Sequence, residues 1–376
     1  MIIGIPKETL TGENRVAMLP EEIKRLSTEY LSFAVETGAG AGAHFKDEDY
    51  ANGGAEIVSD IYANSDIIVR INPPSIEETN KLKEGSILIS LLAPFTNHDL
   101  VKSLAQKNIS SFCLELIPRT TYAQSMDVLS SQATVAGYKA VLNAAEHLSK
   151  FFPMLMTPAG TIKPAKVLVL GAGVAGLQAI ATASRLGAKV EAFDVRPAAR
   201  EQVESLGAKF LYMDLDDSAE TESGYAIEMD EEFIRKELEL LHEASKKVDA
   251  VITTALIFGK KAPILLKDYM VNDMQSGSVI IDLAAENGGN CELTKPGEVI
   301  HHNGVIIDGR LNLPSQVSQH ASQMLSKNIA KLLSDLLKDG TLNYDLENEI
   351  TKGCLVTHKG EIIHEMTKNI IEGESK

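Results

Sequence analysis

The stretch between Lys166 and Arg185 carries no charged residue and has three glycines near its middle. Its length reaches the lower limit for a membrane-spanning helix. However, it begins with the apolar run KVLVL, passes through GAGVAG, and continues into a pattern that contains Gln178, Thr182 and Ser184. Glycines placed between an apolar run and a helical pattern mark a turn. The stretch therefore predicts a strand, a tight turn and a helix, not a membrane span.

Short apolar runs alternate with helical patterns on both sides of this stretch. Strands are predicted before it at MIIGIP, LSFAVETG, DIIVRI, SILISLL and ISSFCLELIP, and after it at KVEAFDV, KFLYMD, DAVITTA, SVIIDLA and GVIIDG. Strands that alternate with helices favour parallel βαβ units with helices on both faces of a sheet. Since 376 residues suffice for two such domains, we predict an α/β protein with two domains.

Four other segments complete this outline. A proline-free helical pattern at 130–152 predicts a long helix that joins the two domains. The run MLMTPAGTIKP, around Pro158, predicts a projecting hairpin of the kind that often serves as a dimer arm. The acidic segment 214–232 predicts an exposed, mobile loop, and CLVTHKGEII predicts a short hairpin near the end of the chain.

Composition excludes several classes of function. The net charge of −16 disfavours nucleic acid as a partner. Cys113, Cys291 and Cys354 form no CxxC pair and the nine histidines have no metal-ligand spacing, so we expect no disulfide framework and no metal. Lys7 and Glu8 interrupt the N-terminus before a signal-peptide core forms, which favours a cytoplasmic location.

The glycine-rich turn has the features of a dinucleotide-binding site. Gly171 would make the tight turn, Gly173 would let a pyrophosphate approach the backbone, and Gly176 would let helix and strand pack closely. Val174 opens the helix, whose free N–H groups would face the phosphates. Asp194 ends the next predicted strand at the spacing expected for a ribose ligand. A Rossmann-like turn without a ligand is the alternative.

The segment Asp194-Val195-Arg196 bears on the choice of nucleotide. A carboxylate binds the adenosine ribose hydroxyls but repels a 2′-phosphate, which favours NAD over NADP. Arg196 complicates this prediction, because an arginine at such a position can receive the 2′-phosphate.

A polar loop follows the last predicted strand of the first domain. Arg119, Gln124, Ser125, Met126 and Asp127 lie at the carboxyl edge, where α/β sheets hold ligands. A cation, an amide and a carboxylate so close together suit a nicotinamide ribose. A solvated turn with an internal Arg–Asp pair is the alternative explanation.

Near the first strand, Asn14-Arg15 offers a cation for a carboxylate substrate, with a surface salt bridge as the alternative. No GxSxG elbow or cysteine–histidine arrangement is present, so nucleophilic catalysis has no candidate.

Several motifs together resemble one family. They are GIPKE, ENRVAMLP, the RxxxxQSMD loop, GAGVAGLQAI with DVR, GYAIEM and DLAAENGGN. The chain resembles the NAD(H)-binding component of proton-translocating nicotinamide nucleotide transhydrogenase over essentially its whole length. GIPKE, GAGxAG and the GG segment are shared with the related alanine dehydrogenases.

This resemblance implies a fold of two Rossmann-like, doubly wound parallel-sheet subdomains separated by a cleft. Residues 1–129 with 311–376 would form the N-terminal subdomain, and residues 130–310 the NAD(H)-binding subdomain. The resemblance also implies a homodimer in which the hairpin near Pro158 reaches the partner. NADP(H) would be held by a separate component, and a membrane component would conduct protons.

The family also implies roles for individual residues. NAD(H) would bind the GAGVAG turn, including Val174, and the segment from Asp194 to Arg196. Arg119, Gln124 and Asp127 would be catalytic residues that, with Ser125 and Met126, hold the nicotinamide ribose and ring. A loop with Gly224 and Tyr225 would close over the nucleotide.

The relationship to alanine dehydrogenases also distinguishes between two possible activities. Alanine dehydrogenases carry a lysine, a histidine and an aspartate where this chain has Asn72, Leu92 and the Glu286-Asn287 pair. Reduction of a keto or imino acid needs a proton donor, whereas hydride transfer between two nicotinamides needs none. The resemblance therefore favours a transhydrogenase subunit over an alanine dehydrogenase or an NAD-sensing module. It would be a separate polypeptide at the cytoplasmic face of the membrane, with a fragment of a fused chain as the alternative.

Overall fold

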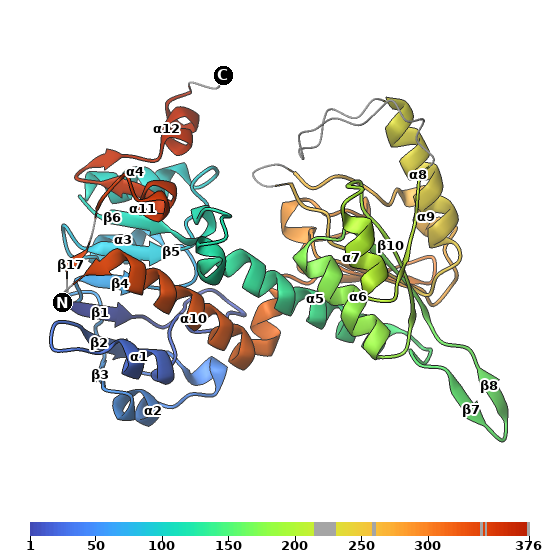
Figure 1. Ribbon diagram of the computed structural model, residues 1–376, viewed down its shortest axis with the longest axis horizontal. Helices are drawn as coiled ribbons and strands as arrows, with labels where there is room; N and C mark the ends of the chain where they lie inside the picture. The colour runs from blue at the N-terminus through green and yellow to red at the C-terminus, as the bar shows by residue number, and fades with distance from the viewer. Residues whose placement is uncertain (214–230, 258–260, 339–340, 343, 374–376) are drawn as a thin grey trace. The chain divides into compact units, whose positions relative to one another are not determined.

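The computed structural model describes residues 1–213, 231–257, 261–338, 341–342 and 344–373 (Figure 1). The chain divides into two compact units: unit 1 is Met1–Gln132 with Pro314–Lys376, and unit 2 is Ala133–Leu313. Helix α5 (Val128–His147) contains the first boundary. This helix confirms the one predicted at 130–152, although it ends earlier.

Unit 1 is built on a sheet with the strand order β3-β2-β1-β4-β5-β6-β18-β19. Strands β1 to β6 are parallel, and β18 and β19 are antiparallel to their neighbours. The strands are β1 (Ile2–Ile5), β2 (Ser32–Glu36), β3 (Ala55–Val58), β4 (Ile67–Val69), β5 (Ile87–Ser90), β6 (Ser110–Cys113), β18 (Leu355–His358) and β19 (Glu361–Ile362). The helices are α1 (Pro20–Leu26), α2 (Asp47–Asn52), α3 (Ile76–Lys81), α4 (His98–Gln106), α10 (Ser318–Leu336), α11 (Glu349–Cys354) and α12 (Glu365–Glu372). A small separate ladder pairs β16 (Leu337–Lys338) with β17 (Thr341–Leu342).

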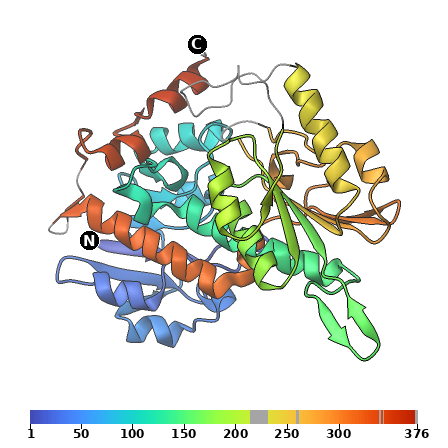
Figure 2. The same cartoon turned by 45° about the vertical axis from the view of Figure 1, so that its right-hand side comes forward.

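The continuous apolar runs of these strands are explained by burial on both faces of the sheet. Along β4, Ile67 and Val69 join a core with Leu325 and Ile329 of α10, whereas Ile68 joins a second core with Leu104 of α4. Figure 2 shows α10 lying along the sheet of unit 1. The C-terminal part of the chain therefore completes the core of the N-terminal unit.

Unit 2 has a sheet with the order β11-β10-β9-β12-β13-β15-β14, in which only β14 is antiparallel among the described strands. The strands are β9 (Lys166–Leu170), β10 (Lys189–Phe193), β11 (Lys209–Phe210), β12 (Ala250–Thr253), β13 (Val279–Asp282), β14 (Val299–His302) and β15 (Val305–Asp308). The helices are α6 (Val174–Arg185), α7 (Ala199–Ser205), α8 (Glu231–Ser245) and α9 (Asp268–Asn272). This arrangement confirms two Rossmann-like, doubly wound α/β units.

Both parallel sheets share one winding pattern. In each unit the chain forms a central strand and two strands outward from it, and then returns to the other side of the central strand. There it adds β4, β5 and β6 in unit 1, and β12, β13 and β15 in unit 2, with β14 at the outer edge. The strand order reverses between β1 and β4 in unit 1, and between β9 and β12 in unit 2. In open α/β sheets, ligands bind outside the carboxyl ends of the strands at this switch point. Each unit therefore has one place where a ligand is expected.

Two strands depart from the expected pattern. β3 lies at the end of a run whose pattern predicts a helix, and the antiparallel edge strand β14 is not among the predicted strands. The hairpin predicted at CLVTHKGEII is confirmed as β18 and β19, and β18 also pairs with β6.

The hairpin predicted around Pro158 is confirmed as β7 (Leu155–Thr157) paired with β8 (Gly160–Ile162). It extends away from the sheet of unit 2 (Figure 1). Two of its apolar side chains are exposed, Met156 at 78% and Ile162 at 44%. An isolated two-stranded hairpin is at best marginally stable in water.

Candidate functional site

The switch point of unit 2 is formed by the glycine-rich turn between β9 and α6. Gly171 has a φ of 96°, which only glycine adopts easily. A Cβ on Gly176 would lie 1.8 Å from the carbonyl oxygen of Gly171, so only glycine allows this close packing. Among the described residues, no atom lies within 4 Å of the position that a Cβ on Gly173 would take. Two glycines thus build the turn, and the third leaves its backbone open to a ligand.

Helix α6 begins directly at this open glycine. Gly173 is its N-cap residue and has no side chain with which to cap the helix. The first N–H groups of a helix have no partner within the helix and favour an anion. Val174, in the first turn, is 43% exposed. The turn therefore fits a pyrophosphate, as the predicted dinucleotide site requires.

Asp194, at the end of β10, is bonded to this turn. Its carboxylate accepts the backbone N–H of Ala172 at 2.7 Å. It also accepts the backbone N–H of Arg196 at 2.8 Å and the guanidinium of Arg196 at 2.9 and 3.0 Å. Burial alone would raise the pKa of Asp194, but the hydrogen bonds from Arg196 and Ala172 hold it below its ordinary value. The carboxylate is therefore ionised at neutral pH. The next residue, Val195, is exposed.

Thr254 lies on the β12 side of the switch point. This residue follows β12, and its hydroxyl donates to the carbonyl oxygens of Gly171 at 3.0 Å and Leu170 at 3.3 Å. Sequence reasoning did not identify Thr254. The signal that would have found it is a polar residue placed directly after the buried strand AVIT.

The predicted loop 119–127 lies in unit 1. Arg119, Gln124 and Ser125 are exposed, whereas Met126 is buried. Asp127 accepts the backbone N–H and the hydroxyl of Ser130 at 2.9 and 2.6 Å, and thus caps the first turn of α5. Within the part of the chain that the structure describes, no ion pair joins Arg119 to Asp127. Three polar side chains of the loop therefore face solvent, and the fourth anchors a helix.

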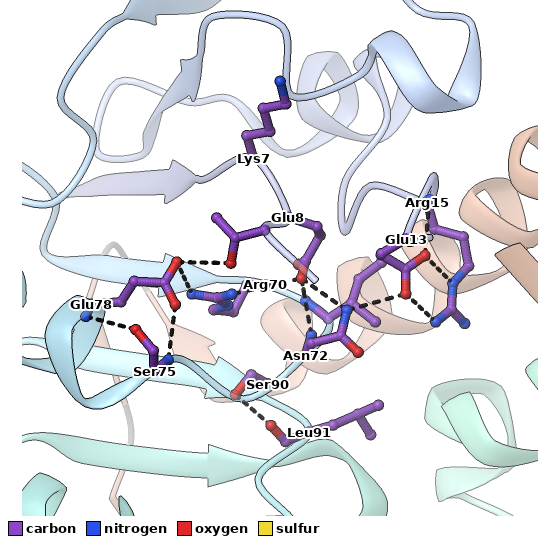
Figure 3. Close-up of polar contacts among 12 residues, drawn as sticks. Lys7, Glu8, Glu13, Arg15, Arg70, Asn72, Ser75, Glu78, Ser90 and Leu91 are labelled. Atoms are coloured by element: carbon purple, nitrogen blue, oxygen red, sulfur yellow. Dashed lines mark hydrogen bonds and ion pairs between the residues drawn. The ribbon is translucent and has the colours of Figure 1, made fainter. Parts of the chain in front are cut away.

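The switch point of unit 1 is filled by the chain's own side chains (Figure 3). Glu8 follows β1, and Arg70 and Asn72 follow β4. Arg70 is buried, with its guanidinium 3.1 Å from Glu78 and 3.7 Å from Glu8. Glu8 also accepts the backbone N–H of Ile71 at 2.6 Å. Burial raises the pKa of Glu8, although Arg70 and the hydrogen bonds oppose this effect.

Arg15 belongs to the same cluster. It is only 7% exposed and donates to both carboxylate oxygens of Glu13, at 2.6 and 2.8 Å, and to Gln132 at 2.9 Å. Asn72 donates one amide group to Glu8 at 3.0 Å and Glu13 at 3.1 Å. The alternative of a surface salt bridge is wrong in one respect, because this ion pair is buried. The guanidinium is matched by the carboxylate of Glu13.

One part of the predicted site cannot be placed. Gly224 and Tyr225, assigned to a loop that closes over the nucleotide, lie outside the described residues, as do residues 214–230 in general.

Two family models match consecutive parts of the chain. The family model "Alanine dehydrogenase/PNT, N-terminal domain" matches residues 4–136, and "Alanine dehydrogenase/PNT, C-terminal domain" matches residues 140–365. The chain is 46% identical over 376 residues to the first polypeptide of the NAD(P) transhydrogenase alpha subunit of Rhodospirillum rubrum, covering 97% of this chain and 98% of the relative.

Two solved structures have the same fold. A transhydrogenase from Sinorhizobium meliloti is 40% identical with a TM-score of 0.86, covering 97% of this chain and all of the other. An L-alanine dehydrogenase, at 24% identity, has a TM-score of 0.82 with full coverage of both chains, which supports the fold alone. The chain therefore belongs to the alanine dehydrogenase/PNT family and, within it, to the transhydrogenase alpha subunits.

Proposed function

We propose that this chain is the NAD(H)-binding component of a proton-translocating transhydrogenase, and that it transfers hydride from NADH to NADP+ held on a separate component. The observation that carries this proposal is the open glycine turn of unit 2. There, the exposed backbone of Gly173 and the uncapped N-terminus of α6 meet at a switch point. The cluster in unit 1 already occupies the corresponding place with its own side chains.

The end of β10 supports NAD(H) as the nucleotide of this component. The ionised carboxylate of Asp194 would accept the adenosine ribose hydroxyls and would repel a 2′-phosphate. Arg196 is bonded to Asp194, so its positive charge is already matched. This pairing reduces the attraction of Arg196 for a 2′-phosphate.

The residues of loop 119–127 are proposed to act at the reactive end. NADH, when bound, supplies the hydride. Arg119, Gln124 and Ser125 would bind the nicotinamide ribose and orient the ring, because their polar groups are exposed and uncommitted to the core. Asp127 would complete this set while it caps α5. Orientation and the exclusion of water are what a transfer between two rings demands of the protein.

Alanine dehydrogenase activity is the alternative, and the cluster in unit 1 argues against it. Asn72 and Leu92 stand where the family comparison expects a lysine and a histidine. The side-chain nitrogen of Asn72 donates to both Glu8 and Glu13, and an amide has no proton to release at neutral pH. Leu92 is fully buried and has no titratable group. Neither residue can protonate a keto or imino acid.

The proposed component acts within an assembly. We propose a NADP(H)-binding component and a membrane proton channel as its partners, which would place it at the cytoplasmic face of the membrane. None of the helices in the described residues has the length and apolar character needed to cross a bilayer. A homodimer is proposed from the uncovered apolar side chains of the β7–β8 hairpin.

The decisive experiment mixes the purified chain with the NADP(H)-binding component and follows hydride transfer from NADH to an NADP+ analogue. Pyruvate with ammonia is the parallel substrate. We expect transfer that requires both components and no NADH oxidation by pyruvate. Pyruvate-dependent oxidation by this chain alone would replace the proposal with the dehydrogenase. Binding of NADH without transfer would leave an NAD-sensing module.

The dimer has its own test. Sedimentation would be compared for the unaltered chain and for the double substitution Met156→Asp with Ile162→Lys, which places charges on the hairpin. We expect the unaltered chain to sediment as a dimer and the variant as a monomer. Unchanged sedimentation would exclude the hairpin as the dimer contact.

A further inference from the structure

Asn290 is a fully buried amide near the carboxyl ends of β12 and β13, and it uses every polar group it has. Its side-chain oxygen accepts the backbone N–H of Ala255 at 3.0 Å. Its side-chain nitrogen donates to the carbonyl oxygens of Ala255 at 2.9 Å and Pro263 at 2.8 Å. Its backbone carbonyl accepts the N–H groups of Leu265 and Leu266. One residue thus holds two separate parts of the chain.

The two parts held by Asn290 flank a short segment with exposed apolar side chains. Ala255 precedes Leu256 and Ile257, which are 53% and 44% exposed, and Pro263 follows residues 258–260, which lie outside the described residues. Because both side chains are exposed, packing in the core does not fix their positions. Their positions are set by Ala255, whose backbone N–H and C=O both bond to Asn290.

Asn290 is itself held by a second buried residue, Asp282, at the end of β13. The carboxylate of Asp282 accepts the backbone N–H of Asn290 at 2.9 Å and of Cys291 at 3.0 Å. It also accepts the hydroxyls of Thr253 at 2.9 Å and Thr294 at 2.6 Å. A buried carboxylate is costly unless it is well hydrogen-bonded, so this set defines one geometry.

This framework lies next to the glycine turn. Thr254, the neighbour of Ala255, donates to the carbonyl oxygen of Gly171 at 3.0 Å. Asp194 marks the adenosine end on the β9–β10 side of the switch point. A dinucleotide that crosses the switch point therefore places its nicotinamide on the β12–β13 side, where Leu256 and Ile257 follow Ala255.

We propose that Asn290 is a positioning residue that holds Leu256 and Ile257 as the apolar surface for one face of the nicotinamide ring. This inference rests on the function proposed above. An apolar surface excludes water from the ring and limits its rotation. Asn290 does not touch the nucleotide and acts through the backbone of Ala255. Neither the motifs of the sequence nor the family resemblance assigned a role to these three residues.

The experiment compares two nucleotides on the full chain. ADP-ribose contains the adenosine, the pyrophosphate and the second ribose but lacks the nicotinamide, so only NADH reports on the ring surface. Dissociation constants for both are measured with Asn290→Ala and Leu256→Ala, together with single-turnover transfer to the partner component at saturating NADH. We expect NADH affinity or the transfer rate to fall about tenfold in both variants, with ADP-ribose affinity unchanged.

Asn272→Ala is the matched control, because Asn272 is an exposed amide of α9 bonded to Asn303 in the turn before β15. This variant should change neither the affinity for NADH nor the affinity for ADP-ribose. Equal losses for NADH and ADP-ribose in both variants, or no loss in either, would overturn the inference. If Asn290→Ala does not fold, Asn290→Ser, which keeps a small polar side chain at this position, is measured in its place. Leu256→Ala, whose side chain is exposed, still tests the ring surface. Failure of the unaltered chain to bind ADP-ribose would instead overturn the proposed function and the inference with it.

Discussion

Two neighbouring carboxylates of unit 1, Glu8 and Glu13, have opposite pKa shifts. Burial raises the pKa of Glu8, whereas at Glu13 the opposing hydrogen bonds and charge of Arg15, with a bond from Asn72, exceed the effect of burial and lower the pKa to about 2. A lowered pKa means that ionised Glu13 stabilises the fold above its unfolded value of 4.5. That contribution is lost as the pH falls through about 2.

We therefore expect Glu13→Gln to lower the free energy of unfolding at pH 7, by on the order of 3 kcal/mol. The difference between the variant and the unaltered chain should shrink as the pH falls from about 4.5 to about 2. Urea unfolding followed by circular dichroism across this pH range measures it. Glu204→Gln, in an exposed ion pair with Arg200, is the control with a small effect. A difference that is constant with pH would contradict the assignment.

Asn143, in unit 2, is a buried polar residue whose substitution is expected to raise stability. It is fully buried in α5, and neither its side-chain oxygen nor its side-chain nitrogen has a partner among the described residues. An unsatisfied buried amide costs free energy that an apolar side chain of similar shape does not. We expect Asn143→Leu to raise the free energy of unfolding by about 1 kcal/mol. Asn290→Leu, at a fully bonded amide, should lower it, and a loss of stability in both variants would contradict the prediction.

At the scale of elements, Asp127 has one role that its hydrogen bonds show and a second role that we propose. It caps α5 through Ser130, and it is also proposed to act on the nucleotide. Asp127→Ala should cost about 1 kcal/mol of stability because the cap is lost. Asp127→Ser keeps a capping hydroxyl, but one short side chain cannot both cap the helix and reach a ligand. Thermal unfolding and single-turnover transfer, measured on both variants, separate the two tasks.

We expect Asp127→Ser to recover stability but not the transfer rate. Recovery of both properties would show that Asp127 is a cap alone and would remove it from the proposed site. Gln124→Asn, which shortens an exposed side chain, should slow transfer more than it weakens NADH binding, since its proposed task is orientation.

Elements differed in how far the sequence could predict them. β9 and α6 followed from KVLVL and GAGVAG because turn, strand and helix signals agreed at one place. β3 is only Ala55–Val58 and follows a helical pattern, so its pairing with β2 depends on a neighbour distant in sequence. The edge strand β14 ends with residues too polar to stand out as a strand. Edge and terminal strands need tertiary partners that local patterns do not specify.

The residues of the candidate site also differ in how far the sequence could predict them. Gly171, Gly173, Gly176 and Asp194 lie within one βαβ unit, so local spacing was enough to predict that they come together. The bonds of Asn290 to Ala255 and of Arg15 to Gln132 join residues far apart in sequence. Such contacts arise only when the strands assemble and their ends meet at one edge of the sheet. A single polar residue after an apolar run does not indicate which distant residue it will contact.

At the scale of the whole molecule, each unit has its own cores and its own switch point. The features that we propose to bind the phosphates lie in unit 2, so a ligand without the nicotinamide should stabilise unit 2 in particular. At 100 times its dissociation constant, a ligand that binds only the folded state adds about 2.7 kcal/mol. We expect ADP-ribose to slow amide hydrogen exchange in β9, β10 and β12 by the corresponding factor of about 100, with little change in β1, β4 and β5.

Asp194→Ala provides the control, because it removes the carboxylate that is proposed to bind the ribose. It also removes the bond to the backbone N–H of Ala172, but it leaves the three glycines of the turn unchanged. In that variant the same concentration of ADP-ribose should protect β9 and β10 far less. Equal protection in the strands of both units would mean that the units open together, so that binding to one stabilises both. Protection confined to unit 1 would move the nucleotide to the cluster of Glu8 and Arg70. That result is not expected, because those side chains are already paired with one another and with Glu78 and Asn72.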